Sequence, residues 1–380
     1  MKKAVEIPVL VGLAAFLALG DRYLISVLYE KLMEGYHVSS TLLFSAIFTS
    51  FYIGYTAFQI PAGRIAERHG PSRISGLSLI TWSLLFIALP LVRYFPLAIA
   101  VSFLIGATQS PIFPSIIFIL RLFFKDEQYA RVSGITAAFG DLSPALIPVT
   151  AFSLLSLGRG ILLPFIFFGI LGVLIGAVLI FVKIDYAPQL SSDWSSLADV
   201  NFVVFGLSFL VYDLFYYILF TWYPYLLKER FSIGSVSFLF GSAPWIIMAA
   251  GSILFGFVLD SLNRDHFVSI ISYAVILLSL IGISLTENKI LFLVLVISSL
   301  FFLNPILIAS WRLSTRLSGE RRSSFVGGWM NFWGNVGGII APFLSVFMID
   351  KVGFSKTFLL SSTIPVAGMA CWAYLGRPRK

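Results

Sequence analysis

Charged residues, cysteine and histidine are all scarce in this chain of 380 residues. Asp, Glu, Lys and Arg make up 12% of it, roughly half the share found in soluble domains, which argues strongly against a soluble protein. The single cysteine excludes a disulfide framework, and the three histidines form no cluster with it. We therefore expect no structural disulfide and no metal site.

Motifs of familiar enzyme chemistry are also missing. The sequence has no Walker A phosphate loop, no dinucleotide-binding glycine fingerprint and no Ser–His triad pattern. ATP hydrolysis and membrane enzymology therefore have no support, and we expect a protein that is not an enzyme and has no cofactor.

Long apolar segments dominate what is present, since hydrophobic residues make up 58% of the chain and 38 of them are Phe. A helix needs about 20 apolar residues to cross a bilayer, and roughly twelve such segments occur. The expected spans are 5–28, 39–62, 74–92, 97–120, 130–156, 161–182, 200–227, 234–257, 267–285, 290–313, 324–349 and 356–376. Proline and glycine inside them are tolerated, because neighbouring helices and hydroxyl side chains satisfy the freed backbone groups.

One polar linker, residues 183–199, lies at the midpoint of the chain. Together with the twelve apolar segments, this linker predicts an all-α membrane protein with twelve transmembrane helices. We expect the helices to form two six-helix bundles, 1–182 and 200–380. The first apolar stretch resembles a signal peptide but continues without a clear cleavage site, so we interpret it as a retained helix.

The net charge of +8 is better explained by membrane orientation than by nucleic acid. With an even number of spans both termini lie on one side, and loop Lys and Arg residues are enriched on that side. We therefore expect both termini and the linker to be cytoplasmic, in a multi-pass protein of the cell membrane that binds no nucleic acid.

A short sequence occurs twice, half a chain apart: Gly63 to Gly70, and Gly256 to Arg264. In each copy an acid follows the first glycine by four residues, and three residues later comes a residue type suited to a left-handed turn. We interpret both copies as cytoplasmic loops. Their glycines allow close helix approach, and their acids cap a helix N-terminus or pair with arginines. Contacts of that kind form in one conformation and break in another, so the gating candidates are Gly63, Glu67, Arg68, Gly70, Arg73, Gly256, Asp260 and Arg264.

Charges inside predicted membrane segments indicate function, because each is costly at the bilayer centre. The candidates are Asp21 and Arg22 in the first span, Asp141 in the fifth and Asp213 in the seventh. Arg22 needs a permanent anionic partner. A guanidinium facing a central cavity suits a carboxylate; the alternative is a structural pair with Asp21 or Asp141.

Asp21 is a candidate proton carrier, because an anion that occupies Arg22 would favour its protonation. Asp141 and Asp213 are further candidates for proton coupling, and a hydrogen-bonded structural role is the alternative for each. In the eleventh span, Asn331 and Asn335 share one helical face and are candidate substrate ligands. Packing alone explains the neighbouring glycines.

The first repeated segment resembles the signature of the major facilitator superfamily, with Glu67 where aspartate is usual. Within it the chain resembles the anion:cation symporters, which include carriers of organic acids and sugar acids. The resemblance lies in Asp21 to Ser26, in Phe51 to Gly63 and in Gly106 to Pro114, and more loosely in Trp222 to Tyr225 and Gly334 to Gly338.

That resemblance implies that Arg22 and Tyr55 contact an anionic substrate, that Asn335 and Asn331 close on it, and that Asp21 titrates. Gln109, another candidate for substrate binding, stands where the branch usually has a proton-carrying glutamate. Coupling to fewer protons, uniport and exchange therefore all stay open.

We thus expect a monomeric carrier in the lipid bilayer that alternates between inward- and outward-open states and moves a small organic anion, a carboxylate, together with protons. The expected substrate site lies between the two halves. An efflux carrier for lipophilic compounds and a non-transporting receptor are the alternatives. Uptake of labelled carboxylates would support the organic-anion carrier, and resistance to hydrophobic toxins would support the efflux carrier.

Overall fold

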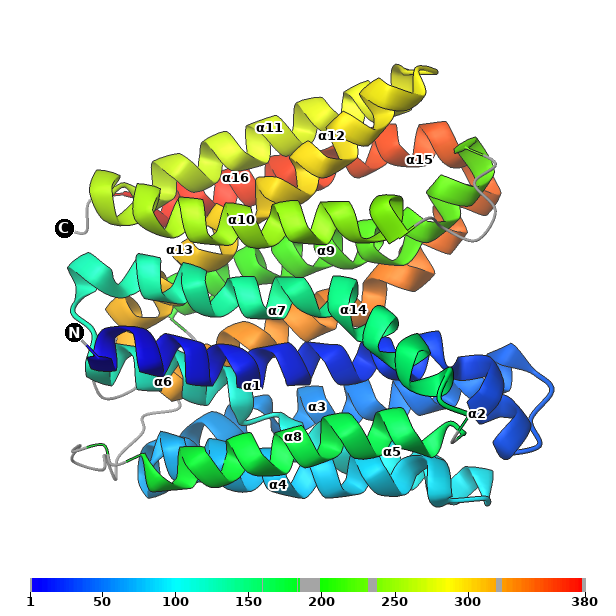
Figure 1. Ribbon diagram of the computed structural model, residues 1–380. Helices are drawn as coiled ribbons and strands as arrows, with labels where there is room; N and C mark the ends of the chain where they lie inside the picture. The colour runs from blue at the N-terminus through cyan, green and yellow to red at the C-terminus, as the bar shows by residue number, and fades with distance from the viewer. Residues whose placement is uncertain are drawn as a thin grey trace. The chain divides into compact units, whose positions relative to one another are not determined.

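The computed structural model describes residues 2–158, 160–182, 184, 199–231, 238–318 and 323–377, and the regular structure in these residues is helical. Figure 1 shows the helices in chain order. They are α1 (Lys2–Val27), α2 (Tyr29–Gly35), α3 (Thr41–His69), α4 (Pro71–Ala88), η1 (Leu89–Leu91), α5 (Phe95–Gln109), α6 (Ile112–Phe123), α7 (Asp126–Leu155), α8 (Leu162–Phe181), α9 (Val200–Phe231), α10 (Phe238–Leu262), α11 (Asp265–Leu285), α12 (Lys289–Phe301), α13 (Leu303–Ser318), α14 (Ser323–Val352), α15 (Phe354–Ser361) and α16 (Thr363–Leu375).

Every expected span coincides with one helix or with two consecutive helices, which confirms the all-α membrane fold. Among the described residues, 11 segments are long and apolar enough to cross a membrane. α14, with 30 residues, covers the remaining expected span, 324–349. The linker at 183–199 lies almost entirely outside the described residues, so the division into two six-helix bundles stays a prediction.

Some expected spans are broken inside the membrane segment. Pro111 separates α5 from α6, because a proline ring cannot be accommodated in a regular helix interior. Between α12 and α13 the break is supported by Asn304, which accepts a bond from the Ser252 hydroxyl (2.8 Å) and donates to the Met248 carbonyl (2.7 Å). A third break separates α15 from α16.

The repeated segments are helical rather than loops, which corrects that expectation. Gly63 to His69 forms the last turns of α3, and Gly256 to Leu262 forms the last turns of α10. The chain turns only where the helix in each copy has ended, at the predicted turn residue: Gly70 has φ +96° and Asn263 has φ +47°. The predicted turn positions are therefore confirmed, and each acid lies one turn inside a helix.

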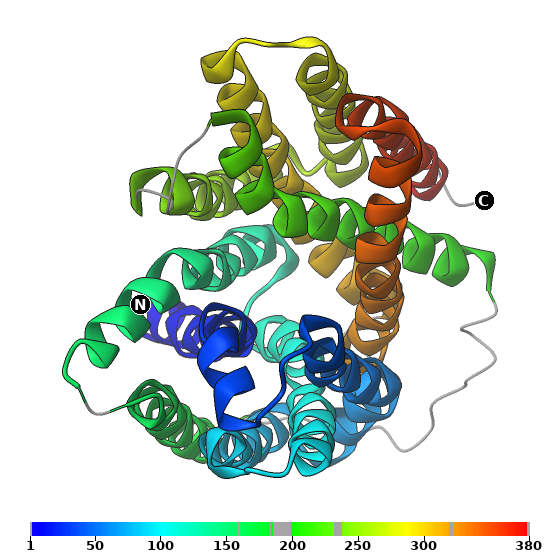
Figure 2. The same cartoon turned by 90° about the vertical axis from the view of Figure 1, so that its right-hand side faces the viewer.

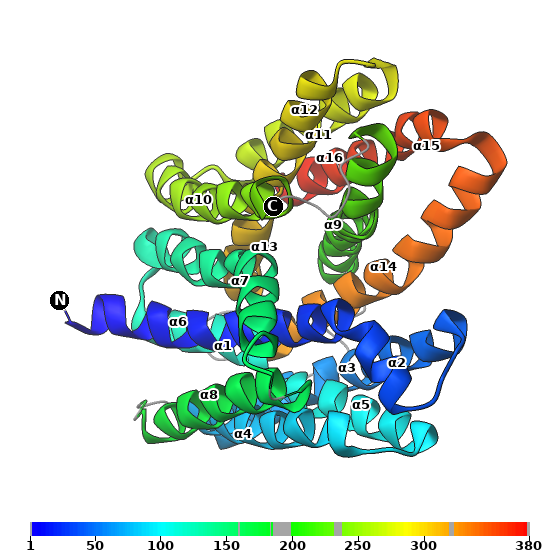
Figure 3. The same cartoon turned by 45° about the vertical axis from the view of Figure 1, so that its right-hand side comes forward.

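The described chain divides into two compact units. The first unit comprises Met1–Lys125, Ile135–Ser192 and Ser318–Trp329; the second comprises Asp126–Gly134, Asp193–Leu317 and Met330–Lys380. The first turns of α7 therefore belong to the second unit, and the first turns of α14 belong to the first. Figure 3 shows α14 as one long helix.

In the first unit, α4 and α8 pack along their length, side by side in Figures 1 and 2. Gly76 faces the backbone of Gly176, and Gly176 faces that of Gly76, so a side chain at either position would meet the other helix. Small residues permit this close approach, which gives van der Waals contact in lipid, where the hydrophobic effect no longer drives helix association.

In the second unit, α11 packs against α12, α15 and α16, and α16 also packs against α9. In the first unit, the connection that follows α2 is fixed by Tyr36, whose hydroxyl donates to the Leu89 carbonyl (2.8 Å). Burial raises the pKa of Tyr36, so this hydroxyl keeps its proton and remains a donor.

Candidate functional site

Arg22 lies in an aromatic setting within the first unit. Its guanidinium carbon lies 4.6 Å from the ring centroid of Tyr55, 4.8 Å from that of Phe51 and 5.5 Å from that of Tyr52. Its Nη2 donates to Oε1 of Gln109 at 3.2 Å. The structure therefore brings together three of the predicted substrate-binding residues, Arg22, Tyr55 and Gln109.

Helical spacing explains this arrangement. Tyr55 lies three residues after Tyr52 and four after Phe51 on α3, so its ring shares a helix face with each of them. Phe51 and Tyr55 stack with centroids 5.6 Å apart and planes at 15°. Tyr55 and Gln109 are buried, whereas Arg22 is only half-buried. The guanidinium therefore keeps accessible surface while its contacts with the aromatic faces stabilise its charge.

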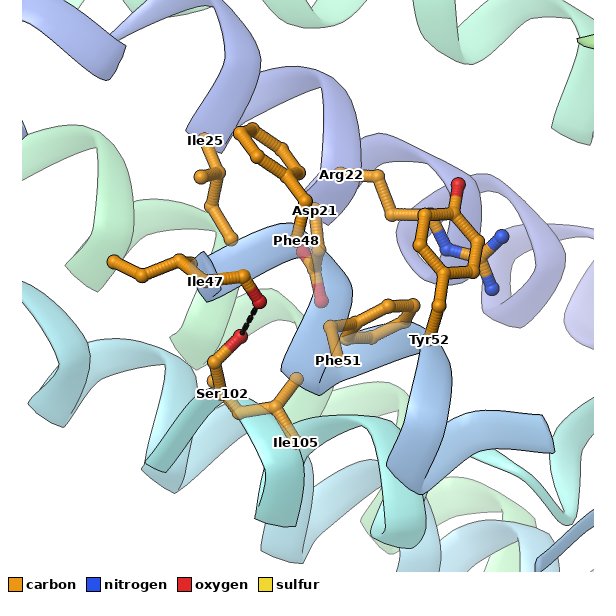
Figure 4. A pocket seen from close by; sticks show the side chains of 9 residues that line it. All are labelled: Asp21, Arg22, Ile25, Ile47, Phe48, Phe51, Tyr52, Ser102 and Ile105. Atoms are coloured by element: carbon orange, nitrogen blue, oxygen red, sulfur yellow. Dashed lines mark hydrogen bonds between the residues drawn. The ribbon is translucent and has the colours of Figure 1, made fainter. Parts of the chain in front are cut away.

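Asp21 is buried and accepts a hydrogen bond from the indole Nε1 of Trp82 on α4. Neighbouring helical residues point about 100° apart, so the carboxylate and the Arg22 guanidinium are directed to different surroundings. Figure 4 shows Arg22 extending beside the Tyr52 ring while Asp21 points to another side of α1. Sequence reasoning missed Trp82, because Trp82 and Asp21 are 61 residues apart in the chain and a contact between them leaves no local signal.

A small cavity adjoins Asp21 and Arg22 (Figure 4). Its empty space is about 310 Å³, including the part that is open to solvent. α1, α3 and α5 supply its walls. Its lining residues are Asp21, Arg22, Ile25, Ile47, Phe48, Phe51, Tyr52, Ser102 and Ile105. The hydroxyl of Ser102 donates to the Ile47 carbonyl at 2.8 Å, so that group is already satisfied.

The predicted residues of α14 and α9 lie in the second unit. Asn331 and Asn335 are buried one turn apart, and Nδ2 of Asn335 donates to the Asn331 carbonyl at 2.7 Å. A carboxylate oxygen of Asp213 on α9 lies against Gly334 of α14. Asp213 is half-buried there. Asp141 is buried on α7 within the first unit. All four keep their predicted roles as untested candidates.

The acid of the first repeated segment meets the start of α14. Oε1 of Glu67 accepts a hydrogen bond from the backbone N–H of Phe325 at 2.7 Å, and Gly63 lies against the backbone of Ser324. The first N–H groups of a helix lack partners within it, and the helix dipole favours a negative charge there. Glu67 thus acts as the predicted type of N-terminal partner.

The acid of the second segment meets the first turns of α7 in the same manner. Asp260 accepts bonds from the backbone N–H groups of Ala130 and Arg131, both at 3.0 Å. It also accepts from Arg131 Nε at 3.3 Å and from Arg312 Nη1 at 3.2 Å. Gly256 lies against the backbone of Ala130 and Arg131. The repeated sequence therefore makes a repeated contact.

Asp260 belongs to a larger buried network. Arg312, 1% exposed, also donates to the Asp265 carboxylate through Nε (3.0 Å) and Nη2, and to the Leu259 carbonyl (2.9 Å). Arg316 Nη1 donates to Asp265 at 2.8 Å. A buried arginine is thus shared by two carboxylates, the arrangement that offsets the cost of burying charge.

Sequence reasoning missed Arg312 and Asp265, although the signals were present. Arg312 lies inside the predicted span 290–313 and belonged among the intramembrane charges. Asp265 begins α11 directly after the second repeated segment. Arg68, Arg73 and Arg264 are exposed, so their predicted gating roles rest on the sequence alone. The described residues contain no group of His, Cys, Asp and Glu that would hold a metal ion.

Comparisons with known proteins identify the family of this chain. The family model described as Major Facilitator Superfamily matches residues 11–342 and 206–380. A hexuronate transporter of Bacillus subtilis (strain 168) is 27% identical, with 91% of this chain and 88% of the relative covered. A probable L-galactonate transporter of Escherichia coli (strain K12) is 23% identical, with 95% and 87% covered. Among solved structures, the E. coli fucose:proton symporter FucP superposes with a TM-score of 0.79 at 13% identity, covering 99% of this chain and 100% of that one.

Proposed function

Since the chain belongs to the Major Facilitator Superfamily, it is a multi-pass membrane transporter and not an enzyme, and we propose that its substrate is a sugar acid. The carboxylate of the substrate binds Arg22, and the site changes access by alternating between the two sides of the membrane. The carrier works as a monomer in the cytoplasmic membrane with both termini in the cytoplasm.

The observation that supports this proposal is the half-buried guanidinium of Arg22 between three aromatic rings. A planar guanidinium matches a carboxylate with two parallel hydrogen bonds. One of its nitrogens donates to Gln109 at 3.2 Å, which restrains that side of the fork. Hexuronates and galactonate, the compounds in the relatives' names, combine a carboxylate with several hydroxyls.

Tyr55 supplies the ring nearest to Arg22, and Asn331 and Asn335 supply amides from α14 that hydrogen-bond the substrate. Aromatic and amide groups of this kind suit a hydroxylated acid better than a lipophilic compound, because an unmatched buried polar group is costly. The relatives' names also favour acids over lipophilic cargo.

Asp21 couples transport to protons in this proposal. When an anion neutralises Arg22, the electrostatic field of the guanidinium no longer favours an ionised neighbour, so substrate binding and protonation of Asp21 support each other. Asp141 and Asp213 are the next candidates if Asp21 does not carry the proton.

Glu67 and Asp260 serve as two halves of a gate. Each acid holds the beginning of a helix, α14 or α7 respectively, by hydrogen bonds to backbone N–H groups. Releasing such a contact costs a few kcal/mol at most, which is within the range that substrate binding supplies. Gly63, Gly70, Gly256 and the exposed arginines Arg68, Arg73 and Arg264 complete this gate.

Uptake of labelled D-glucuronate and D-galactonate into proteoliposomes tests the proposal. We expect saturable uptake of at least one sugar acid, stimulated when the external side is more acidic, and no transport of ethidium. A protein that moves ethidium but neither acid would overturn the assignment. If uptake does not depend on an imposed pH gradient, the substrate class is retained and proton coupling is refuted.

A further inference from the structure

Gln59 is a fully buried amide that the proposed anion site does not use. It lies on α3, and neither its oxygen nor its nitrogen has a hydrogen-bond partner among the described residues. Leaving both ends of a buried amide unmatched is unfavourable, whereas an apolar side chain of the same shape is not. Packing therefore does not explain a glutamine at this position.

Its place on the helix connects it with the anion site. Tyr52, Tyr55, Thr56 and Gln59 are spaced three or four residues apart and share one face of α3. Side chains on a helix lean toward its N-terminus, so the Gln59 amide is directed to the turn that holds Tyr55 and Thr56. The Arg22 guanidinium lies over Tyr55 and Tyr52.

Three other buried atoms extend the set. Thr56 Oγ1, Gln109 Nε2 and Ser115 Oγ also lack partners among the described residues. Gln109 already uses its Oε1 for Arg22, so its Nε2 adjoins the anion site directly. Ser115 lies on α6, which packs against α3, and both helices contact the first turns of α14 through Gly327 and Gly328.

We infer that these residues, Thr56, Gln59, Gln109 and Ser115, form a polar row that binds the hydroxyl groups of the substrate, with Gln59 as the residue that sets the preference for hydroxylated acids. The inference rests on the proposed function, because the carboxylate on Arg22 is the anchor from which the hydroxyl-bearing carbons extend. Tyr55 and Gln59 are separated by about one helical turn, 5.4 Å, which a chain of a few carbons spans.

The chemistry of the row fits hydroxyl groups specifically. A hydroxyl is both donor and acceptor, and the Gln59 amide offers one group of each kind. A site with buried hydrogen-bonding groups discriminates strongly against an analogue that lacks the hydroxyl, because its own groups are then left unpaired. If buried water satisfied these polar groups instead of the substrate, the protein would bind an acid with hydroxyls and an acid without them equally well.

Ligand-dependent thermal stabilisation of the purified full-length protein tests this inference. The probes are D-gluconate and hexanoate, two acids of equal carbon number with and without hydroxyls, titrated to obtain apparent affinities. We expect the wild type to prefer gluconate at least tenfold. Gln59→Met should lose about tenfold affinity for gluconate and keep its affinity for hexanoate within twofold.

The ligand-free variant provides an independent measurement. Because Gln59→Met removes an unpaired amide and retains volume, its melting temperature should equal or exceed that of the wild type. Thr56→Val, which removes a hydroxyl of the same row, is the second variant if Gln59→Met cannot be purified. Ser269→Ala on α11 is the matched control, since its hydroxyl is equally buried and unpartnered; it should leave the gluconate preference unchanged.

Each result is decisive. A wild type stabilised by neither acid removes the proposed function and this inference with it. Equal affinity for the two acids retains the anion site and overturns the polar row. An unchanged preference in Gln59→Met and Thr56→Val, or a lower ligand-free melting temperature in Gln59→Met, assigns Gln59 to structure.

Discussion

Replacing Arg312 by methionine removes a buried cation and leaves its carboxylate partners in place. Arg312 is 1% exposed, and the side chains of Asp260 and Asp265 are 6% and 7% exposed. The arginine makes three hydrogen bonds to these carboxylates and a fourth to the Leu259 carbonyl. After the substitution, water cannot readily replace it at this depth.

The size of the effect follows from what each acid retains. Asp265 keeps Arg316 at 2.8 Å, and Asp260 keeps two backbone N–H groups and Arg131. The loss is therefore smaller than the sum of three charge-assisted hydrogen bonds, and the value for breaking one buried ion pair applies, about 3–5 kcal/mol. A chain of 380 residues loses about 1.2 °C of melting temperature per kcal/mol, so the melting temperature should fall by about 4 to 6 °C.

Thermal unfolding of the purified variants in detergent measures this effect. Arg264→Met is the control, because Arg264 is exposed and directly precedes Asp265, the first residue of α11. This variant should change stability by less than about 0.5 kcal/mol. Arg312→Lys keeps a charge but not the three-way fork, so it should fall between the two. If Arg312→Met melts within about 2 °C of Arg264→Met, the network does not stabilise the second unit and the reasoning fails.

Further variants test the anion site and the coupling. Arg22→Lys keeps the charge and loses the planar fork, so we expect normal membrane insertion and a KM for the sugar acid raised about 10-fold or more, as measured by initial uptake rates; an unchanged KM would refute the anion clamp. Asp21→Asn should abolish accumulation driven by a pH gradient but preserve counterflow exchange. If accumulation persists, Asp21 is not the proton carrier and Asp141 or Asp213 is the next candidate. Gln109→Glu should make uptake fall more steeply as external pH rises. An ionised glutamate 3.2 Å from Arg22 competes with the substrate anion, whereas a protonated glutamate resembles glutamine. Superimposable pH profiles of wild type and active variant would show that position 109 is not at the site.

The fold was predictable from the sequence because membrane spans depend on length and polarity, which a linear sequence displays. The breaks at Pro111 and near Asn304 were not anticipated, since in a membrane proline and asparagine are compatible with continuous helices as well. The helical state of Gly63 to His69 was also missed. Its polar residues resemble a loop, and the burial of Glu67 against the start of α14 leaves no signal in the sequence.

The site was predictable in part for a related reason. Arg22 and Asp21 are visible as charges in an apolar run, and helical spacing places Asn331 beside Asn335. Trp82 and Gln59 carry no such mark, because their importance arises from what surrounds them in space. Arg312 is also a charge in an apolar run, but it lies close to the end of its predicted span, 290–313, where a basic residue is ordinarily explained by membrane orientation.

The mutual contact of Gly76 and Gly176 has a consequence for biogenesis. α4 and α8 face each other, yet roughly 90 residues separate their starting points, and at 5–20 residues per second the ribosome needs about 5 to 20 seconds to supply the second after the first. During this interval the glycine face of α4 has only lipid or the insertion machinery beside it. A nascent chain that stops before Leu162 therefore exposes an unmatched helix surface that quality-control proteases can recognise, until α8 supplies the matching glycine face.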